Sequence, residues 1–353
     1  MPKVSVIRTK PETVLEDYKK LLDTSEVKKH LPCNEELLLK LNLSWSLYYP
    51  ACSTEPWQLE GVLKYLKENS YNNVQGVENK TVVTNVMKGV KGNKWGPVME
   101  KYGCPFTRLD TAEWIDYKPK HDTPALDCIF PDRHRIPKMF IGKNVMHLPT
   151  LKTHGHTTMT GAMKNAFGGL ITERRHHSHK MIHSILVDLL QVQKEIHPHL
   201  FAVMDGAVAG NGKGPRTMEP VETNLLLASD DQVAIDAVSA RLMGFDPMQI
   251  PFIKMAHDKG LGCGDVAQID MEGDDVTNVN LNFHTGKSPV IFFDQLFRKK
   301  MKFIEPLLFH TGLFQLCVFG SAFYHDVFWY NVVGKSRIKS FSKTSWGQLF
   351  DKY

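Results

Sequence analysis

The chain has 353 residues, of which 42% are hydrophobic and 23% charged, and its formal net charge is +5 at pH 7. This length suits one large domain or two smaller ones, and the ordinary composition excludes a chain that is disordered throughout. Acidic residues are spread along the sequence and no basic stripe stands out, so we expect no nucleic-acid partner.

Cysteine usage indicates a reducing compartment. The six cysteines include no Cys-x-x-Cys pair, so the chain has no local iron–sulfur motif, and they are too few for a disulfide scaffold. The first residues, MPKVSVIRTKPE, lack the apolar core of a secretory signal. We therefore expect a cytoplasmic protein, with peripheral attachment to a membrane left open.

Residues 1–137 are interpreted as an N-terminal α/β part. The run LLLKLNL (Leu37–Leu43) suits a buried strand, and Asn73–Glu78 resembles a second strand that ends in a carboxylate. Between them, Thr54–Glu68 has apolar residues at helical spacing, with Thr54 as the expected N-cap. Alternating strands and helices favour an α/β fold, with a mixed or mainly parallel sheet and helices on both faces.

Residues 138–285 are interpreted as a C-terminal α/β part that carries the main motifs. The sequence LFAVMDG predicts a strand ending at Asp205, followed by a glycine-rich loop, Gly210–Pro215. A second strand, Leu225–Asp231, leads into a predicted helix, Gln232–Met243, which a glycine terminates.

Residues 286–353 are interpreted as an apolar and aromatic, helical C-terminal extension. Within it, Phe303–Tyr330 is strongly apolar, and Pro306–Tyr324 contains no charged residue. Three alternatives are a membrane-spanning helix, a helix that binds a partner or a membrane surface, and a buried core element. Glycine and polar residues interrupt the run, so we expect the segment to fold onto the protein.

The segment Leu148–Gly169 (LPTLKTHGHTTMTGAMKNAFGG) is the first candidate site, at the end of a strand and the start of a helix. Lys152, His154 and His156 alternate, so they share one side of an extended chain. Thr157, Thr158 and Thr160 are expected to cap the helix.

One turn into that helix come Lys164 and Asn165. Two lysines beside a helix N-terminus suit a carboxylate or a phosphate. The alternative is an ordinary capped helix with solvated lysines.

A second candidate is the histidine-rich run from Arg174 to His183. On a helix, His176, His179 and His183 would lie on one face. Together with His154 and His156, or with Asp205, these imidazoles could hold zinc or iron. The alternative is a set of partly exposed histidines near a helix start.

The glycine-rich loop is a third candidate. Backbone N–H groups at Gly212 and Gly214 could form an anion-binding nest, although a tight glycine turn explains the pattern equally well.

The sequence resembles the domain-of-unknown-function family 362. The resemblance rests on LPTLKTHG, GAMKNAFGG, VDLL, VMDG, GNGKGP, LLASDDQVAIDAVSARLMGFDP and KGLG, all between Leu148 and Gly264. It is weaker in the N-terminal half, through CSTEPWQLEGVL, GVEN and LKLNL. In the last of these the family has Lys-Pro-Asn, and here Leu41 replaces the proline.

The resemblance implies an α/β fold without an agreed general reaction. Some members carry an appended ferredoxin-like domain with two iron–sulfur clusters. This sequence contains no such cysteine runs, so a cluster-based redox role is expected to need a separate ferredoxin. The positions that the resemblance places at a shared site are Lys40, Asn42, Glu78, Lys152, His154, Lys164, Asn165, Asp205 and Asp236.

We therefore expect an enzyme acting on a small anionic molecule in a cleft lined by lysine and histidine, with a metal as an open question. The expected catalytic residues are Lys152, His154, Lys164, Asn165 and Asp205. The expected substrate-binding residues are Lys40, Asn42, Glu78, Gly212 and Gly214, and the expected metal ligands are His154, His156, His179 and His183. The rival hypothesis is a non-catalytic binding or redox-accessory protein that uses residues 303–330 against a protein partner or a membrane surface.

Overall fold

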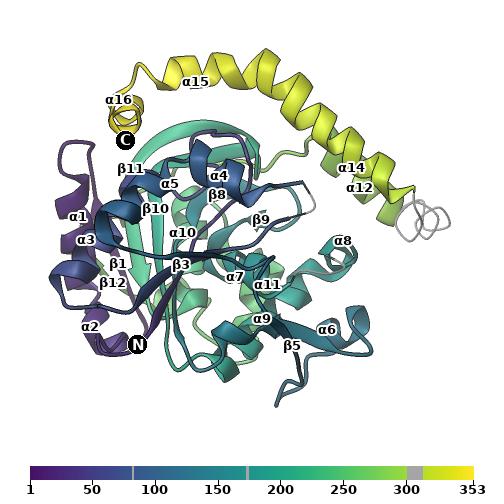
Figure 1. Ribbon diagram of the computed structural model, residues 1–353, viewed down its shortest axis with the longest axis horizontal. Helices are drawn as coiled ribbons and strands as arrows, with labels where there is room; N and C mark the ends of the chain where they lie inside the picture. Colours follow the sequence, from purple (N-terminus) through teal and green to yellow (C-terminus); the bar gives the residue numbers. More distant parts are fainter. Residues whose placement is uncertain (82, 172–174, 300–312) are drawn as a thin grey trace.

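A computed structural model describes residues 1–81, 83–171, 175–299 and 313–353, which fold around one large mixed sheet (Figure 1). In spatial order the main path of this sheet is β12 (Asp270–Gly273), β1 (Lys3–Arg8), β11 (Thr217–Ser229), β10 (Leu200–Lys213), β7 (Asn144–His147), β2 (Leu37–Lys40), β3 (Val74–Glu78) and β4 (Phe106–Arg108). A side branch consists of β8 (Thr150–His154), which pairs with β10, and β9 (Thr158–Met159). A separate two-stranded sheet is formed by β5 (Trp114–Tyr117) and β6 (His134–Pro137).

Within the large sheet the pairings are parallel, except β1 with β11, β10 with β11 and β8 with β9. The sequence prediction of a mixed, mainly parallel sheet flanked by helices is therefore confirmed.

The helices are α1 (Val14–Thr24), α2 (Val27–His30), α3 (Pro56–Glu68), α4 (Val86–Gly92), α5 (Trp95–Tyr102), α6 (Pro124–Ile129), α7 (Gly161–Leu170), α8 (Arg175–Ser178), α9 (Ile182–Ile196), α10 (Gln232–Met243), α11 (Pro251–Asp258), α12 (Pro289–Lys299), α14 (Phe314–Ala322), α15 (Lys335–Phe341) and α16 (Ser345–Lys352). Short 3₁₀ turns are η1 (Lys138–Phe140), η2 (His179–Met181), η3 (Pro247–Gln249) and η4 (Val266–Gln268), and η5 (Phe323–Gly334) is π-helical.

Both faces of the sheet are buried, which explains why its central strands are apolar throughout. In β2, Leu38 packs with α7, α9 and α10, whereas Leu37 and Leu39 pack with α1, α3 and α5 on the other face. This alternation follows from the period of two along a strand. Because the parallel strands end at one edge, polar residues after β2, β3 and β8 are brought together there.

Two of the predicted helices, α10 and α3, are present in the structure, but only α10 has a side-chain cap at its N-terminus. Helix α10 covers the predicted range, and Asp231 caps it by accepting hydrogen bonds from Val233 N and Ala234 N. Helix α3 begins at Pro56, but Thr54 is not its N-cap. The Thr54 hydroxyl instead donates to Leu148 O at 2.8 Å and accepts from Asn42 N at 2.8 Å, so this side chain ties the ends of two strands together.

Two local predictions are wrong. The glycine-rich stretch Gly210–Lys213 is not a loop, because β10 continues through it and pairs with β11. Glycine suits this stretch because a Cβ on Gly210, in β10, would overlap Met218, and one on Gly214, in the turn that follows, would overlap Thr153 O. The histidine-rich run is not one regular helix either: α8, the 3₁₀ turn η2 and α9 follow one another with a change of geometry.

The C-terminal helical extension runs along one side of the molecule and then returns to the body of the fold (Figure 1). Its middle is attached through Trp45 Nε1, which donates to Asp326 Oδ1 at 2.6 Å. Its end is buried, since Trp346 lies 5.0 Å from Trp57 between ring centroids and donates to Asn224 Oδ1 at 2.8 Å. Residues 303–312 of the predicted apolar segment lie outside the described residues.

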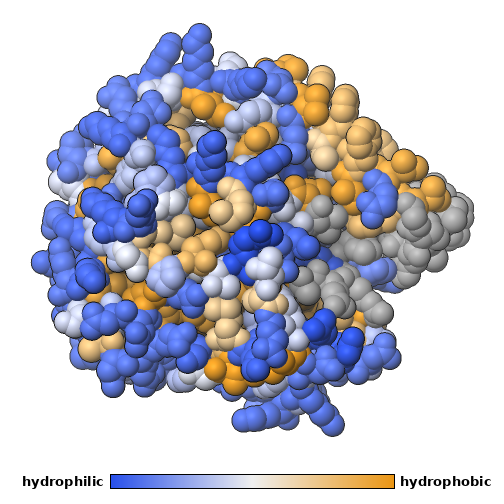
Figure 2. Space-filling view, in the orientation of Figure 1, coloured by the Kyte–Doolittle hydropathy of each residue, from blue (hydrophilic) through white to orange (hydrophobic). Residues whose placement is uncertain are grey.

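Among the described residues, no helix has both the length and the apolar character needed to cross a membrane. The extension nevertheless carries exposed apolar side chains, including Leu316, Phe319 and Phe323, which are 67%, 70% and 53% exposed. In Figure 2, hydrophobic surface gathers on the upper right, where Figure 1 places these helices.

Candidate functional site

A cavity of about 570 Å³ opens where the ends of β2, β3 and β8 meet the start of α7. The turn between β10 and β11 closes one side, and α12, α14 and η5 form the opposite wall. Its lining is divided by chemistry. The cationic side chains and most of the imidazoles come from the body of the fold, whereas the aromatic and aliphatic side chains, with the imidazole of His325, come largely from the C-terminal helices.

The ends of β2 and β3 contribute a buried ion pair, Lys40 and Glu78. Lys40 Nζ lies 2.8 Å from Glu78 Oε1 and also donates to Leu41 O at 2.6 Å. Burial lowers the pKa of Lys40, and the charge of Glu78 opposes that shift. Gly168 and Gly169 let α7 approach this pair, because a Cβ at Gly169 would lie 3.2 Å from Lys40 Cε. This ion pair lines the base of the cavity.

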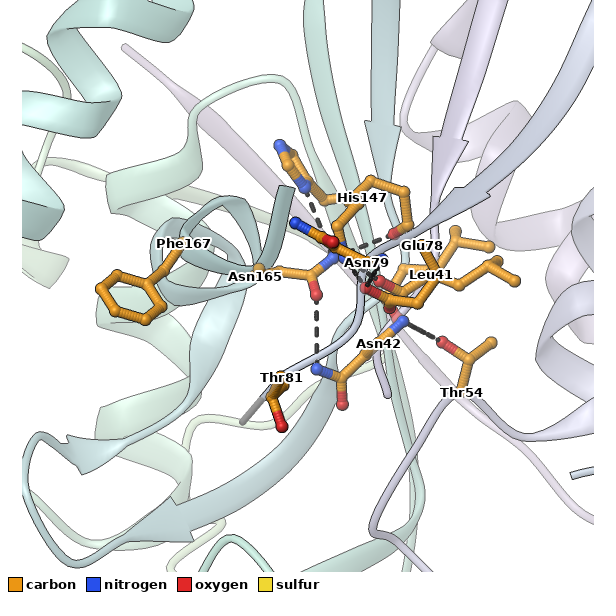
Figure 3. Close-up of polar contacts among 12 residues, drawn as sticks. Leu41, Asn42, Thr54, Glu78, Asn79, Thr81, His147, Asn165 and Phe167 are labelled. Carbon is orange, nitrogen blue, oxygen red and sulfur yellow. Dashed lines mark hydrogen bonds and ion pairs between the residues drawn. The ribbon is translucent and has the colours of Figure 1, made fainter. Parts of the chain in front are cut away.

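Two amide side chains connect the strand ends to α7 (Figure 3). Asn42 Nδ2 donates to Asn165 Oδ1 at 3.3 Å, and Asn165 Nδ2 donates to Lys40 O at 2.9 Å. Asn42 N is held by Thr54 Oγ1. The two amides are therefore fixed in orientation at the cavity wall, which they both line.

Lys152, on β8, lies behind this wall rather than in it. Its Nζ donates to Asn42 Oδ1 at 2.5 Å, to Cys52 O at 2.6 Å and to Ser44 Oγ at 3.1 Å, and the residue is fully buried. Burial lowers the pKa of Lys152 to about 8. The three acceptors occupy its three N–H groups, so Lys152 positions Asn42 and does not present a free charge to the cavity.

Lys164 and Arg216, in contrast, line the cavity with hydrogen-bonding capacity unused. Within the described ranges, Lys164 Nζ has no hydrogen-bond or ion-pair partner, and it lies 5.8 Å from the centroid of the Phe167 ring. Arg216 Nη1 is buried and also has no hydrogen-bond partner among the residues that the structure describes. Burial lowers the pKa of Lys164 to about 7, with a further contribution from the charge of Lys152. Burial also lowers the pKa of Arg216.

Arg175 and Lys213 add positive charge to the same lining. Arg175 is occupied in part by the end of α7, where it donates to Ile171 O at 2.5 Å and to Gly168 O. Lys213 is exposed at the end of β10. The cavity is thus electropositive on the side formed by the body of the fold.

The four histidines predicted as metal ligands divide into two groups. His154, His156 and His179 line the cavity, and the His156 and His179 rings stack with centroids 5.0 Å apart. His154 Nδ1 accepts a hydrogen bond from His156 N at 3.1 Å, and burial holds the pKa of His154 well below its usual range. His183 is directed elsewhere, with its ring 5.9 Å from that of Phe252.

A carboxylate from the C-terminal extension lies beside two of the imidazoles that face the cavity. Asp294, on α12, brings a carboxylate oxygen within 4.8 Å of ring nitrogens of both His156 and His179. The group that the structure assembles is therefore His156, His179 and Asp294, rather than the four predicted histidines.

Asp205 lies away from the cavity, on the face covered by α1 and α3. Its Oδ2 accepts from Tyr18 Oη at 2.6 Å and from Trp57 Nε1 at 2.9 Å, and its Oδ1 accepts from Ala207 N at 3.0 Å. Burial raises the pKa of Asp205 to about 6. These contacts make Asp205 a link between the sheet and two helices.

The predicted glycine nest is not formed by Gly212 and Gly214. Gly212 N donates to His284 O at 3.1 Å, and Gly214 N donates to Gly212 O at 3.0 Å, so both N–H groups are already used. The N-terminus of α7 is also occupied. Asp236, and not a threonine, accepts from Ala162 N at 2.5 Å and Met163 N at 3.0 Å. An anion in the cavity would therefore meet side chains rather than these backbone groups.

The sequence analysis missed Arg216 and Asp294. Arg216 directly follows the Gly-Lys-Gly-Pro motif, and a cation beside a glycine-rich turn is a signal that could have singled it out. Asp294 has no such signal, because its place depends on how the C-terminal extension folds back.

Comparison with known proteins places the chain in a family. The family model described as Domain of unknown function (DUF362) matches residues 37–241. Thylakoid-associated protein sll1697 from Synechocystis sp. is 35% identical over 127 residues, which are 35% of this chain and 39% of that protein. The chain thus matches well under two thirds of the length of this relative, and no solved structure matches the chain. Since the family model covers more than half of the chain, the protein belongs to the DUF362 family.

Proposed function

We propose that the protein is an enzyme that acts on a small anionic molecule held in the cavity by Lys164 and Arg216. The observation that carries this proposal is that two cationic side chains line one cavity with hydrogen-bonding capacity unused. Among the described residues Lys164 has no hydrogen-bond or ion-pair partner and Arg216 Nη1 has no acceptor, although the charge of Asp326 opposes the lowering of the Arg216 pKa. A buried cationic N–H group without an acceptor costs free energy, and a bound carboxylate, phosphate or sulfate would remove that cost. Cavities that hold ionisable groups with displaced pKa values are also common sites of catalysis.

The proposed roles follow from the contacts of each residue. Lys164 and Arg216 hold the negative charge, with Arg175 and Lys213 adding to the local field. Asn42 and Asn165 orient the ligand by hydrogen bonds. Because Lys164 has a pKa of about 7, it is suited to exchanging a proton near neutral pH.

His154 is better suited to donating a hydrogen bond than to acting as a base. Its Nδ1 accepts from His156 N, so the neutral ring carries its proton on Nε2. The low pKa of His154 keeps the ring neutral at physiological pH. A neutral imidazole N–H can polarise a carbonyl or stabilise a developing negative charge.

The opposite wall suggests that the anion also has an apolar portion. Phe293, Phe297, Phe314 and Val318 line this wall and face the cationic side across the cavity. A ligand with a charged head and a short apolar chain would match both halves. Hexyl sulfate and inorganic sulfate therefore form a useful pair of probes, because they share a charged group and differ in the chain.

The test is calorimetric titration of the full-length protein with these two probes. We expect hexyl sulfate to bind more tightly than sulfate, and Lys164→Met and Arg216→Met each to weaken binding by about tenfold, the loss of one charge-assisted hydrogen bond. Lys118→Met is the matched control, because it removes an exposed lysine outside the cavity. Unchanged affinity in both cavity variants, or no binding to the wild type, would refute the proposal.

A second candidate function is attachment to a membrane surface, in keeping with a non-catalytic or accessory role. The exposed apolar side chains of α14 and η5 favour it, and the relative from Synechocystis sp. is named as thylakoid-associated. A separate ferredoxin would be the partner for any redox role. Flotation with anionic vesicles tests the membrane hypothesis, with Phe319→Ser and Phe323→Ser expected to reduce recovery in the vesicle fraction. Equal recovery of wild type and variants would count against it.

A further inference from the structure

We propose that His156, His179 and Asp294 form a binding site for one divalent transition metal, zinc or ferrous iron. The three residues come from distant parts of the chain: the turn after β8, the 3₁₀ turn η2, and helix α12. Their candidate ligand atoms all lie within 4.8 Å of one another, and all three side chains line the cavity.

The donor set suits these metals. Two imidazole nitrogens and one carboxylate oxygen match catalytic zinc sites, which leave a coordination position open. The same set matches the two-histidine, one-carboxylate sites of non-haem ferrous iron. In both cases the open positions would face the cavity, where a ligand oxygen could occupy them.

Only small side-chain movements are needed. Zinc–nitrogen bonds of about 2.0–2.1 Å place tetrahedral ligands roughly 3.3 Å apart, which is closer than the separations described here. The stacked rings of His156 and His179 would have to turn about their Cβ–Cγ bonds. Such rotations are accessible because the two imidazoles and the Asp294 carboxylate are only partly buried.

The backbone that carries these residues is already fixed. Gln295 Nε2 donates to Gly155 O at 3.1 Å, which joins α12 to the turn that holds His156. A Cβ on Gly155 would lie 2.8 Å from Ile291 Cδ1, so the turn and the helix are in close contact. Asp294 and His156 therefore remain neighbours even when their side chains rotate.

A simple histidine–aspartate ion pair is the alternative to a metal site. His156 Nε2 and Asp294 Oδ2 lie 3.9 Å apart, which is beyond hydrogen-bond distance. This separation still allows an ion pair when His156 is protonated, whereas the second imidazole stacked on His156 supplies the further nitrogen ligand that a metal site needs.

The experiment uses full-length protein without a histidine tag, stripped with a chelator and titrated with Zn²⁺ alone, and anaerobically with Fe²⁺ alone. We expect one equivalent to bind per chain, and His179→Ala and Asp294→Ala to weaken binding by at least about tenfold. The absorption spectrum of Co²⁺-loaded protein should show coordination by nitrogen, and should lose intensity in both variants.

Matched controls are His199→Ala and Asp270→Asn, which alter a histidine and a carboxylate outside the cavity. Circular dichroism checks that each variant folds, and Asp294→Glu, which keeps the carboxylate, should retain part of the affinity. Because no anion is added, the result does not depend on the proposed function. Stoichiometry far below one in the wild type, or full binding in folded His179→Ala and Asp294→Ala, would overturn the metal site.

Discussion

Lys40 and Glu78 form an ion pair at the ends of two adjacent parallel strands, with side chains only 1% and 3% exposed. The pair also uses the backbone, since Glu78 Oε1 accepts from Asn79 N at 2.7 Å and Lys40 Nζ donates to Leu41 O. Each of the two charges is thus compensated by the other in the protein interior, and both residues line the cavity.

The first prediction concerns this pair. Glu78→Met should lower the free energy of unfolding by about 3–5 kcal/mol, because it leaves the Lys40 ammonium buried without its carboxylate. The double variant Lys40→Met with Glu78→Met should lose less than Glu78→Met alone, because no uncompensated charge remains. Urea unfolding measures both. If the loss in the double variant equalled the sum of the losses in Glu78→Met alone and Lys40→Met alone, the two charges would not be coupled.

A second prediction uses the titration of Asp205. Its pKa is raised from 3.8 to about 6, so the folded state binds this proton more tightly than the unfolded state does. The resulting stabilisation is complete below about pH 4 and is lost as the pH rises towards 6. At about 1.4 kcal/mol per pKa unit, the wild type should lose up to about 3 kcal/mol more than Asp205→Asn between pH 4 and pH 7.

Urea unfolding at a series of pH values measures this difference. The exposed carboxylate variant Asp270→Asn should keep the wild-type pH dependence. If Asp205→Asn kept it as well, then Asp205 would titrate near its ordinary pKa.

The third prediction compares two glycines. Gly161 has φ +71° and directly precedes the backbone groups that Asp236 caps, so a Cβ there would overlap the Asp236 carboxylate. Gly161→Ala should therefore cost at least about 2 kcal/mol through strain and loss of the cap.

Gly96→Ala is the control, because Gly96 lies within helix α5 with nothing within 4 Å of an added Cβ. This substitution should leave stability unchanged or raise it by up to about 1 kcal/mol. Thermal unfolding followed by circular dichroism measures both variants, and similar melting temperatures for the two would contradict the role of Asp236.

A fourth prediction follows from Lys164. Its pKa is lowered to about 7 by burial, so its charge is present below pH 7 and is lost as the pH rises. The affinity for hexyl sulfate, whose charge does not change in this range, should fall above pH 7. Lys164→Arg should bind with an affinity that stays constant to higher pH, because arginine remains charged. Parallel pH profiles for the two proteins would show that another group controls binding.

Much of the fold could be predicted because it is encoded locally. The alternation of Leu37, Leu38 and Leu39 between two apolar clusters is the reason that LLLK suits a buried strand. Helix α10 has its cap at Asp231 and its stop at Gly244, which are adjacent to it in sequence. Such signals need no knowledge of the rest of the chain.

Where a residue's partner is distant in sequence, local signals are insufficient. The threonines before α7 are good capping residues, but Asp236 takes their place because α10 packs against α7. The alternation that places Lys152 beside His154 is correct along β8, yet it cannot show that Asn42 and Cys52 O enclose the Lys152 ammonium. Sequence reasoning identified the segment and could not identify which of its charges remains free.

The C-terminal return of the chain has a consequence for how this protein is made. Trp57 and Tyr48 are synthesised early, but Trp346 and Phe350 of α16 cover them, with the Tyr48 and Phe350 rings only 3.7 Å apart between centroids. Strand β1 likewise has no neighbour in the sheet until β11 and β12 have been synthesised, because it pairs with these two strands. A nascent chain therefore exposes these aromatic side chains and an unpaired first strand until the residues of β11, β12 and α16 have emerged from the ribosome.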